Sequence, residues 1–255
     1  MFAAERQKRI LELLEQSGSV WVSKLSTELG VTEETVRRDL EKLEKQELLM
    51  RTHGGAVQIG RTSYELSLEK RKKTNVEAKQ KLAKAACAHI MPGDTIFLDA
   101  STTTFFMARE LRGMHNLTVI TNSLRVVEEL VGCEGIKLIA AGGFVSANMS
   151  FVGSLAEEVI REKYYAGKLF FSSRGIDAAA GILESNESER AIKAAMLENC
   201  SRAYYMCDAS KIGKVGFAKL AGFCDIDCII TDAELDEDIC EALTENGVEI
   251  EIVEN

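Results

Sequence analysis

The sequence predicts an α/β protein in two parts, an N-terminal winged helix-turn-helix followed by a mostly parallel α/β domain. Apolar residues recur at helical spacing through the first 45 residues, and short strand-like runs around a glycine pair follow them. Beyond residue 76, apolar strand-like runs alternate with helical segments, which is the βαβ rhythm of a parallel sheet. We therefore expect domains at 1–58 and 76–255, joined by a polar linker at 59–75.

The N-terminal part has the spacing of three short amphipathic helices, at Arg6–Ser17, Val22–Leu29 and Thr32–Lys45. Gly30 supplies the sharp turn that often joins the second and third helices of such a unit. Thr32 suits the N-cap of the third helix because its hydroxyl accepts a free backbone N–H. The buried stripe of this helix is expected to consist of Val36, Leu40 and Leu43.

Two strand-like runs, Leu48–Thr52 and Ala56–Ile59, flank His53-Gly54-Gly55 and predict a hairpin wing after the third helix. Trp21 stands where the second helix would begin with a Ser or Thr cap. We expect this indole to pack against the unit instead of capping the helix.

The third helix presents basic side chains that suit duplex DNA, because a helix of this kind enters the major groove with its N-terminal half nearest the bases. Residues 1–84 contain 17 Lys and Arg against 13 Asp and Glu, whereas the remaining residues contain 14 against 27. The alternative is a small protein-interaction module in which the pair Arg37-Arg38 forms only a solvated face. The residues expected to contact DNA are Lys24, Thr32, Glu34, Thr35, Arg37, Arg38, Lys42, Arg51 and His53.

A run of hydroxyl residues follows the first strand of the second domain. Asp99 ends that strand and Ser101–Thr104 open a helix, so hydroxyls and free backbone N–H groups meet at the positive end of a helix dipole. Strand ends at 121–123, 142–143 and 175–177 are expected at the same rim, because ligands of open α/β sheets bind outside the carboxyl ends of the strands. The run predicts an anion site, and the alternative is a simple N-cap.

The segment 6–57 resembles the DeoR family of bacterial regulators, notably in Glu34–Leu40 (ETVRRDL) and Arg51–Ala56 (RTHGGA). The resemblance implies a sensor fold similar to ribose-5-phosphate isomerase. It also implies a homo-oligomeric repressor of carbohydrate-metabolism genes, a dimer or a tetramer, that a phosphorylated sugar or related metabolite releases from operator DNA. It continues through Asp99–Thr104, Thr121–Ser123, Gly142-Gly143, Gly175–Asp177 and Asp208–Gly213.

The same resemblance implies which residues meet the effector. Ser101–Thr104 and Lys211 would hold the phosphate, while Asp99, Asn122 and Asp177 would meet hydroxyls of the sugar. Lys193 fits this role as well as it fits a solvated lysine on the helix 187–200. The full expected set is Asp99, Ser101, Thr102, Thr103, Thr104, Asn122, Gly142, Gly143, Arg174, Asp177, Lys193 and Lys211.

A sugar-phosphate isomerase-like enzyme with an added nucleic-acid-binding module is the main alternative function. Ser172-Ser173-Arg174 places a cation where the isomerases need a carboxylate, and the three histidines lie in the wing, on a helix and in a loop. Proton transfer at a sugar carbon needs a positioned base, so we expect no catalysis. A scaffold that binds neither DNA nor a ligand is favoured only by the net charge of −9.

Composition excludes several other classes. No apolar run approaches the roughly 20 residues that span a bilayer, and the N-terminus lacks the pattern of an export signal. The seven cysteines show no CxxC spacing, and Cys224 and Cys228 lack a nearby His or further Cys to complete a metal shell. We expect a cytoplasmic protein with reduced thiols, no membrane partner, and no metal or cofactor.

Overall fold

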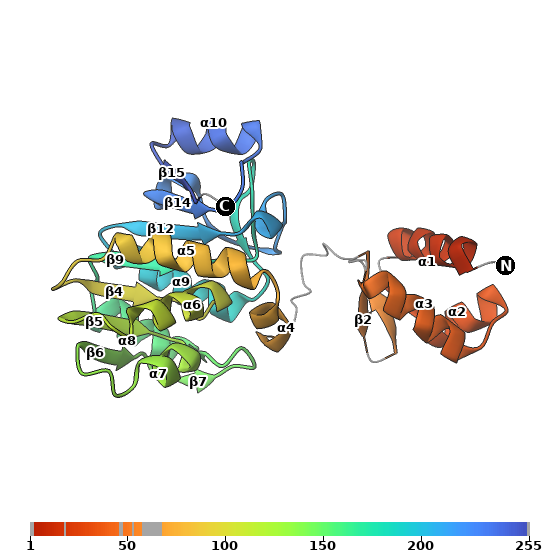
Figure 1. Cartoon of the computed structure of the whole chain (residues 1–255), viewed down its shortest axis with the longest axis horizontal. Helices are drawn as coiled ribbons and strands as arrows, with labels where there is room; N and C mark the ends of the chain where they lie inside the picture. Colours follow the sequence, from red (N-terminus) through yellow and green to blue (C-terminus); the bar gives the residue numbers. More distant parts are fainter. Residues whose placement is uncertain (1–2, 18, 46–47, 53, 58–67, 254–255) are drawn as a thin grey trace. The chain divides into compact units, whose positions relative to one another are not determined.

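The structure is a computed structural model of the whole chain, and it describes residues 3–17, 19–45, 48–52, 54–57 and 68–253. The chain folds as two compact units, Met1–Arg61 and Thr62–Asn255 (Figure 1). The predicted fold class, a winged helix-turn-helix followed by a mostly parallel α/β domain, is confirmed. The predicted linker at 59–75 includes a short helix, α4 (Leu68–Lys73), which its charged sequence LEKRKK did not reveal because it has no apolar period.

The first unit contains three helices, α1 (Ala3–Ser17), α2 (Val22–Leu29) and α3 (Glu33–Lys45), at the positions the spacing predicts. Gly30 ends α2 with φ +65°, a left-handed conformation that glycine adopts without strain. Thr32 caps α3, since its Oγ1 accepts the Thr35 N–H at 3.3 Å. The helices enclose a small apolar core of buried side chains that includes Ile10, Leu14, Leu25, Val36, Leu40 and Leu43.

The wing is a three-stranded antiparallel sheet of order β1-β3-β2, built from β1 (Ser19–Trp21), β2 (Met50–Thr52) and β3 (Gly55–Val57). The strand β1 was not predicted. Gly55 is required where β3 passes β1, because a Cβ there would lie 1.8 Å from the carbonyl oxygen of Val20. The Trp21 side chain makes no cap hydrogen bond and lies beside Gly54, with 56% of the residue exposed.

The second unit is built on a seven-stranded parallel sheet of order β15-β14-β12-β9-β4-β5-β6. The sequence predicts strands at 95–99, 118–121, 137–141, 168–172, 203–207, 228–231 and 248–253, and each range coincides with one strand of this sheet. The chain winds outward from β4 in one direction, through β5 and β6, and later resumes on the other side of β4 with β9. The strands are β4 (Thr95–Leu98), β5 (Leu117–Thr121), β6 (Ile136–Ala140), β9 (Lys168–Phe171), β12 (Ala203–Cys207), β14 (Cys228–Thr231) and β15 (Glu249–Ile252).

Helices cover both faces of this sheet, and Figure 1 shows α5 and α6 crossing its near face. Alternate strand residues feed two cores, since Phe170 and Tyr204 belong to one buried cluster and Phe171 and Tyr205 to the other. The helices are α5 (Val76–Ala88), α6 (Thr102–Leu111), α7 (Leu124–Leu130), α8 (Ser154–Lys163), α9 (Glu187–Glu198) and α10 (Glu237–Glu245), with short 3-10 turns η1 (Ala209–Lys211) and η2 (Phe223–Asp225).

Two small antiparallel sheets complete the second unit. One contains β10 (Gly175–Asp177), β11 (Gly181–Glu184) and β13 (Ala218–Ala221), and the other is the pair β7 (Phe144–Val145) and β8 (Phe151–Val152). The prediction that residues 175–177 end a strand of the main sheet is wrong, because they form β10 of the smaller sheet. A run of three residues carries no periodic signal that distinguishes these two cases.

One buried ion pair joins α1 to α3 within the first unit. The Arg6 guanidinium donates to Oδ2 of Asp39, and Gln7 Nε2 donates to the other carboxylate oxygen at 3.0 Å. Asp39 is 2% exposed and Arg6 is 9% exposed. Removal of either charge breaks this buried, hydrogen-bonded pair in the core of the unit.

We predict that Asp39→Asn destabilises the first unit by about 3 kcal/mol, because it breaks the buried, hydrogen-bonded ion pair between Asp39 and Arg6. Urea unfolding of the full chain, followed by fluorescence of the single tryptophan, Trp21, reports on this unit. Glu33→Gln is the matched control, since it removes an exposed pair on the same helix and should cost at most about 1 kcal/mol. Equal losses in the two variants would contradict the prediction.

Candidate functional site

The exposed face of α3 carries the basic side chains predicted to meet DNA. Arg37 donates to Glu33 at 2.7 Å and Arg38 lies 3.4 Å from Glu34, and all four side chains are about half exposed or more. Exposed pairs one helical turn apart are worth only a few tenths of a kcal/mol. Both guanidinium groups therefore remain available to a partner.

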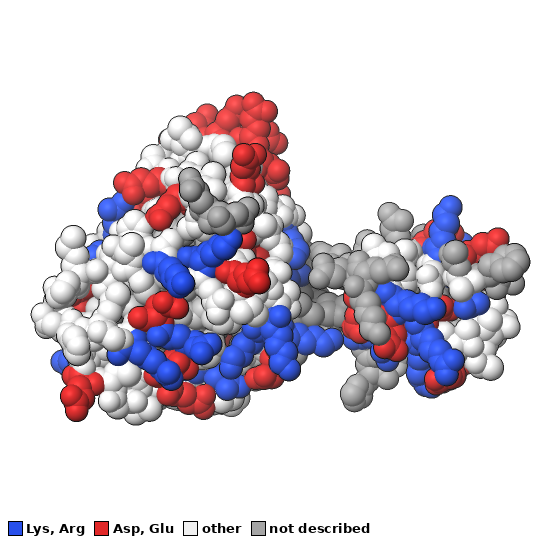
Figure 2. Space-filling view, in the orientation of Figure 1, with Lys and Arg blue, Asp and Glu red and all other residues white. Residues whose placement is uncertain are grey.

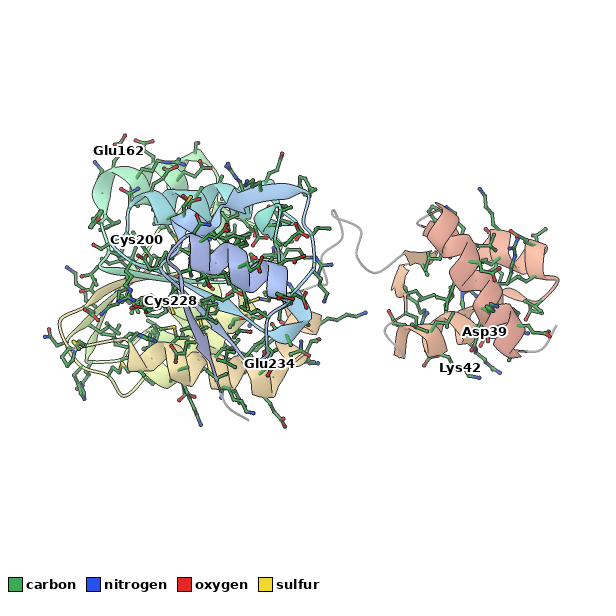
Figure 3. All side chains as sticks on the ribbon, turned by 90° about the horizontal axis from the view of Figure 1, so that it is seen from above. Asp39, Lys42, Glu162, Cys200, Cys228 and Glu234 are labelled. Atoms are coloured by element: carbon green, nitrogen blue, oxygen red, sulfur yellow. The ribbon has the colours of Figure 1, made fainter. Side chains whose placement is uncertain are left out.

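The other predicted contacts surround this face. Lys24, Thr32, Glu34 and Lys42 are exposed, and Thr35 and Arg51 are partly exposed. Figure 3 labels Lys42 and the buried Asp39 on α3. The Arg51 N–H of the wing donates to Glu44 of α3 at 3.1 Å, so the wing is fixed to the helix. His53 lies outside the described residues.

The count over residues 1–84 suggested that the excess of basic residues lies in the DNA-binding unit. It does not. Met1–Arg61 contain 10 Lys and Arg against 10 Asp and Glu, whereas residues 62–84 contain 7 against 3. The excess thus belongs to the segment that includes α4. In contrast, acidic side chains gather over α10 of the second unit, where Figure 2 shows them in red.

The carboxyl ends of β4 and β9 adjoin at the point where the direction of winding reverses. In open α/β sheets such a reversal leaves a crevice in which ligands bind. Asp99 follows β4 and Ser172 follows β9, and the Ser172 N–H donates to Asp99 Oδ2 at 3.2 Å. Asn122 follows β5 and Asp208 follows β12, so four polar residues occupy neighbouring strand ends.

The hydroxyl loop 101–104 forms the N-terminus of α6. Ser101 is the N-cap and accepts the Thr104 N–H at 3.1 Å, while Thr104 Oγ1 donates to Asp99 Oδ1 at 2.8 Å. The backbone N–H groups of Thr102 and Thr103 lie in the first turn, where a helix offers no intrahelical acceptor. Thr103 Oγ1 and Asn122 Oδ1 are buried, and no residue that the structure describes hydrogen-bonds to either atom.

Lys193 of α9 extends into this rim and is 5% exposed, so the alternative of a solvated helical lysine is wrong. Its ammonium group lies 3.1 Å from Asp99 Oδ2, donates to the Ser172 carbonyl at 2.6 Å and pairs with Glu184. Burial alone would lower the pKa of Lys193, but Glu184 and Asp99 hold it above its ordinary value. Lys193 is therefore charged and neutralises the buried carboxylates.

A second charged cluster lies at the end of β12. Lys211 donates to the Ser172 hydroxyl and lies 3.9 Å from Asp208. Burial alone would raise the pKa of Asp208, but Lys211, Ser210 and further donors hold it below its ordinary value. Burial together with the charge of Lys211 lowers the pKa of Lys79 of α5 to about 8, although the charge of Asp208 acts in the opposite direction.

Comparison with known proteins identifies both units. Residues 6–62 match the DeoR-like helix-turn-helix domain, and residues 74–233 match the DeoR C terminal sensor domain. The chain belongs to the DeoR family. It is accordingly a DNA-binding transcriptional regulator of the helix-turn-helix type, as the resemblance of its motifs implies.

Three known proteins illustrate the relationship. An uncharacterized HTH-type transcriptional regulator, YulB of Bacillus subtilis, is 41% identical over 99% of this chain and 98% of its own. A putative aga operon transcriptional repressor of Escherichia coli O157:H7 is 36% identical over 98% of this chain and 94% of its own. Ribose 5-phosphate isomerase A from Methanocaldococcus jannaschii is 17% identical, with a TM-score of 0.41, over 54% of this chain and 55% of its own.

The DeoR-family fold brings most of the expected effector residues to one rim. These residues differ in their burial and in their hydrogen-bond partners. Asp99 is fully buried and both its oxygens accept bonds from the protein. Asp177 accepts the N–H groups of residues 179 and 180 at 3.0 and 2.8 Å, and thereby closes its own turn. Arg174 is partly buried after β9.

The second glycine of the pair after β6, Gly143, has a packing role. Gly142 and Gly143 have φ values of +71° and +114°, and a Cβ on Gly143 would lie 3.0 Å from the carbonyl oxygen of Val152. Gly143 therefore allows the chain to pass close to β8. Whether this pair also meets a ligand stays a prediction.

Four charged or polar residues of this DeoR-family rim were missed from the sequence. Asp208 directly follows a strand, as Asp99 does, so the signal that identified Asp99 could also have identified Asp208. Lys79, Asn75 and Glu184 carry no such signal, because their approach to the rim depends on contacts between distant segments.

Two findings bear on other classes of site. Within the ranges that the structure describes, no helix is long and apolar enough to cross a membrane. In those ranges, no three or more His, Cys, Asp or Glu side chains gather as metal ligands. Cys228 lies buried on β14 and Cys224 is exposed, and both are free thiols.

We predict that Lys79 makes stability depend on pH. Its pKa is about 8 in the folded chain and 10.5 as its ordinary value, so between these values the unfolded chain binds more protons and stability rises with pH. The unfolding free energy of the wild type relative to Lys79→Met should rise from pH 8 to about pH 10, by at most about 1.4 kcal/mol per pH unit. Urea titrations followed by tyrosine fluorescence report on the second unit, which holds all five tyrosines.

The matched control is Lys84→Met, which removes an exposed lysine from the same helix. Its difference from the wild type should stay constant over the same pH range. A flat or falling difference for Lys79→Met would show that the ammonium group of Lys79 is not held in a desolvated, cationic environment.

Proposed function

We propose that this chain is a sequence-specific repressor of carbohydrate-metabolism genes whose affinity for DNA is controlled by a phosphorylated sugar or a related anionic metabolite. The observation that carries the proposal is the pairing, in one chain, of an exposed basic recognition helix with a sheet rim that combines a helix N-terminus, hydroxyls and two lysines. The aga operon relative is named as a repressor, which supports the proposal of repression.

The proposed DNA interface is the exposed face of α3 with the wing beside it. Arg37 and Arg38 would reach base edges or phosphates from the N-terminal half of the helix. Thr32 and Thr35, whose hydroxyls lie 2.9 Å apart, would meet backbone oxygens, and Lys24 and Arg51 would neutralise phosphates. Glu34, Lys42 and His53 complete the proposed contact set.

We predict that Arg37→Ala or Arg38→Ala weakens binding by about 1 to 3 kcal/mol where the arginine contacts a base. Fluorescence anisotropy with a duplex selected in vitro by the wild-type chain measures the loss. A lost phosphate contact would weaken binding to all sequences and reduce the slope of log K against log salt by about 1.

Arg9→Ala is the matched control, because Arg9 forms similar partly exposed pairs, with Glu12 and Glu28, but lies on α1. It should bind as the wild type does. If both α3 variants retain full affinity, α3 is not the recognition helix.

The proposed effector site is the rim at the ends of β4, β5, β9 and β12. Lys211 and the free N–H groups of Thr102 and Thr103 would hold a phosphate. Buried groups that no described residue satisfies, Thr103 Oγ1 and Asn122 Oδ1, are suited to a polar ligand, because buried polar atoms in native proteins are nearly always paired. Asp99 and Lys193 would act mainly by fixing the geometry of the loop.

We further propose that the protein is not an enzyme. The rim contains buried carboxylates, Asp99 and Glu184, but both contact the Lys193 ammonium. Because both carboxylates are engaged by this ammonium group, neither is positioned to take a proton from a sugar carbon. We also propose that the chain forms homo-oligomers, either dimers or tetramers, in the cytoplasm. Two subunits would then place two recognition helices on one operator.

We predict that a phosphorylated sugar raises the unfolding temperature of the wild-type chain and that Lys211→Met abolishes the rise. At a hundred times its Kd, a ligand of the folded state adds about 2.7 kcal/mol. Thermal unfolding with ribose 5-phosphate, glucose 6-phosphate and fructose 1-phosphate, with inorganic phosphate as reference, measures this effect.

Lys219→Met, an exposed lysine on β13, is the control and should keep the ligand response. A rise that survives Lys211→Met unchanged would place the anion elsewhere. Turnover of any of these sugar phosphates by the purified chain would overturn the assignment as a regulator without catalysis.

A further inference from the structure

The helix α4 precedes the rim in sequence and is fixed to it by the side chain of Lys79. Lys79 is 4% exposed, and its ammonium group donates to the carbonyl oxygens of Arg71 at 2.6 Å and Thr74 at 2.8 Å. These carbonyls belong to the C-terminal end of α4, where a helix leaves acceptors unsatisfied. A buried cation from α5 thus holds the end of α4.

Asn75, between α4 and α5, makes a second connection. Its backbone is left-handed, with φ +52°, and its side chain forms no N-cap bond to α5. Instead its amide donates to Oδ1 of Asp208 at 3.1 Å. The turn that follows α4 is therefore tied to the carboxylate that also serves Lys211.

Three further contacts join α4 to other segments around the same rim. The Arg71 guanidinium donates to Asn148, in the β7–β8 loop, at 2.8 Å. The Lys72 ammonium lies 4.4 Å from the ring centroid of Phe105, next to Thr104 in α6. Glu69 pairs with Arg125 of α7 at 2.8 Å. Side chains of α4 thus contact the β7–β8 loop, α6 and α7.

The two lysines of the rim respond to each other electrostatically. Lys211 disfavours the charged form of Lys79, and Asp208 favours it. An anion bound at Lys211 would offset the charge of Lys211 and so stabilise the Lys79 ammonium. A more fully charged Lys79 donates more strongly to the two carbonyls of α4, so the end of the helix would be held more firmly.

We propose that α4 is the response element of this regulator, and that Asn75 and Lys79 are the positioning residues through which an anion at the rim holds it. The inference rests on the proposed function and adds how an anion at the rim would regulate the affinity for DNA. The described sensor unit begins with α4, which is joined through residues 58–67 to the DNA-binding unit. A ligand alters DNA affinity only by as much as it prefers one of two states, and α4 held or released provides such states.

The test is hydrogen exchange of the backbone amides of residues 69–74 in the full chain, with and without the sugar phosphate that stabilises it most among the three named above. In the wild type, the ligand should slow this exchange. Asn75→Gly removes the amide but keeps the left-handed backbone, and Lys79→Met removes the cation. In both variants the slowing should be lost, and Asn75→Gly, which alters no residue proposed to contact the ligand, should still show the ligand-induced rise in unfolding temperature.

Two controls separate this role from a structural one. Asn116→Gly makes the same change at an exposed residue that is also left-handed, with φ +58°, and should respond as the wild type does. Lys79→Arg keeps a cation beside the carbonyls and should restore the slowing. In DNA titrations the ligand should change the affinity of the wild type about 5- to 150-fold, and that of Asn75→Gly much less.

The outcomes distinguish the two levels of the proposal. If a sugar phosphate binds the wild type but leaves the exchange of residues 69–74 unchanged, the role of α4 is wrong and the effector site stands. The role is equally wrong if Asn75→Gly and Lys79→Met respond as the wild type does. If none of the sugar phosphates stabilises the wild type, the effector class fails and this inference fails with it.

Discussion

The buried contact of Lys193 with Asp99 and Glu184 is the interaction on which the sensor unit depends. The reversal of winding between β4 and β9 brings Asp99 beside Ser172, and Lys193 contacts both residues as well as Glu184. Without that cation two carboxylates would lie in the core uncompensated. With it, Asp99 accepts the bonds that shape the loop 101–104, and the first turn of α6 is left with N–H groups that suit an anion.

Charge in this protein is placed by segment and not by unit. The DNA-binding unit is neutral overall, with its cations exposed on α3 and a buried pair, Arg6 and Asp39, holding α1 to that helix. The basic excess lies at residues 62–84, in and around α4. The rim combines a cationic side, with Lys79 and Lys211, and an anionic side, with the buried carboxylate Glu184. Such a division suits a ligand with a phosphate at one end and hydroxyls at the other.

Much of the fold follows from local sequence. The seven strands of the main sheet and the three helices of the first unit are predicted by periodicity and by residues such as Gly30 and Thr32, because burial of one face leaves a regular pattern. The strands β1 and β10 and the helix α4 are not, since they are short and owe their structure to pairing or to contacts with distant segments. In the site, Asp99 and the loop 101–104 are predicted, whereas the burial of Lys193 is not. The local sequence of a helix does not distinguish a lysine that contacts two buried carboxylates from a lysine exposed to solvent.

The central claim is that one anion site and one DNA interface are thermodynamically coupled through this chain. Coupling between binding sites is reciprocal, so calorimetric titration of the sugar phosphate into the free chain and into its DNA complex tests the claim most directly. The account predicts weaker binding to the complex, by the same factor by which the ligand weakens DNA binding. Equal Kd values for the free and DNA-bound chain would contradict it.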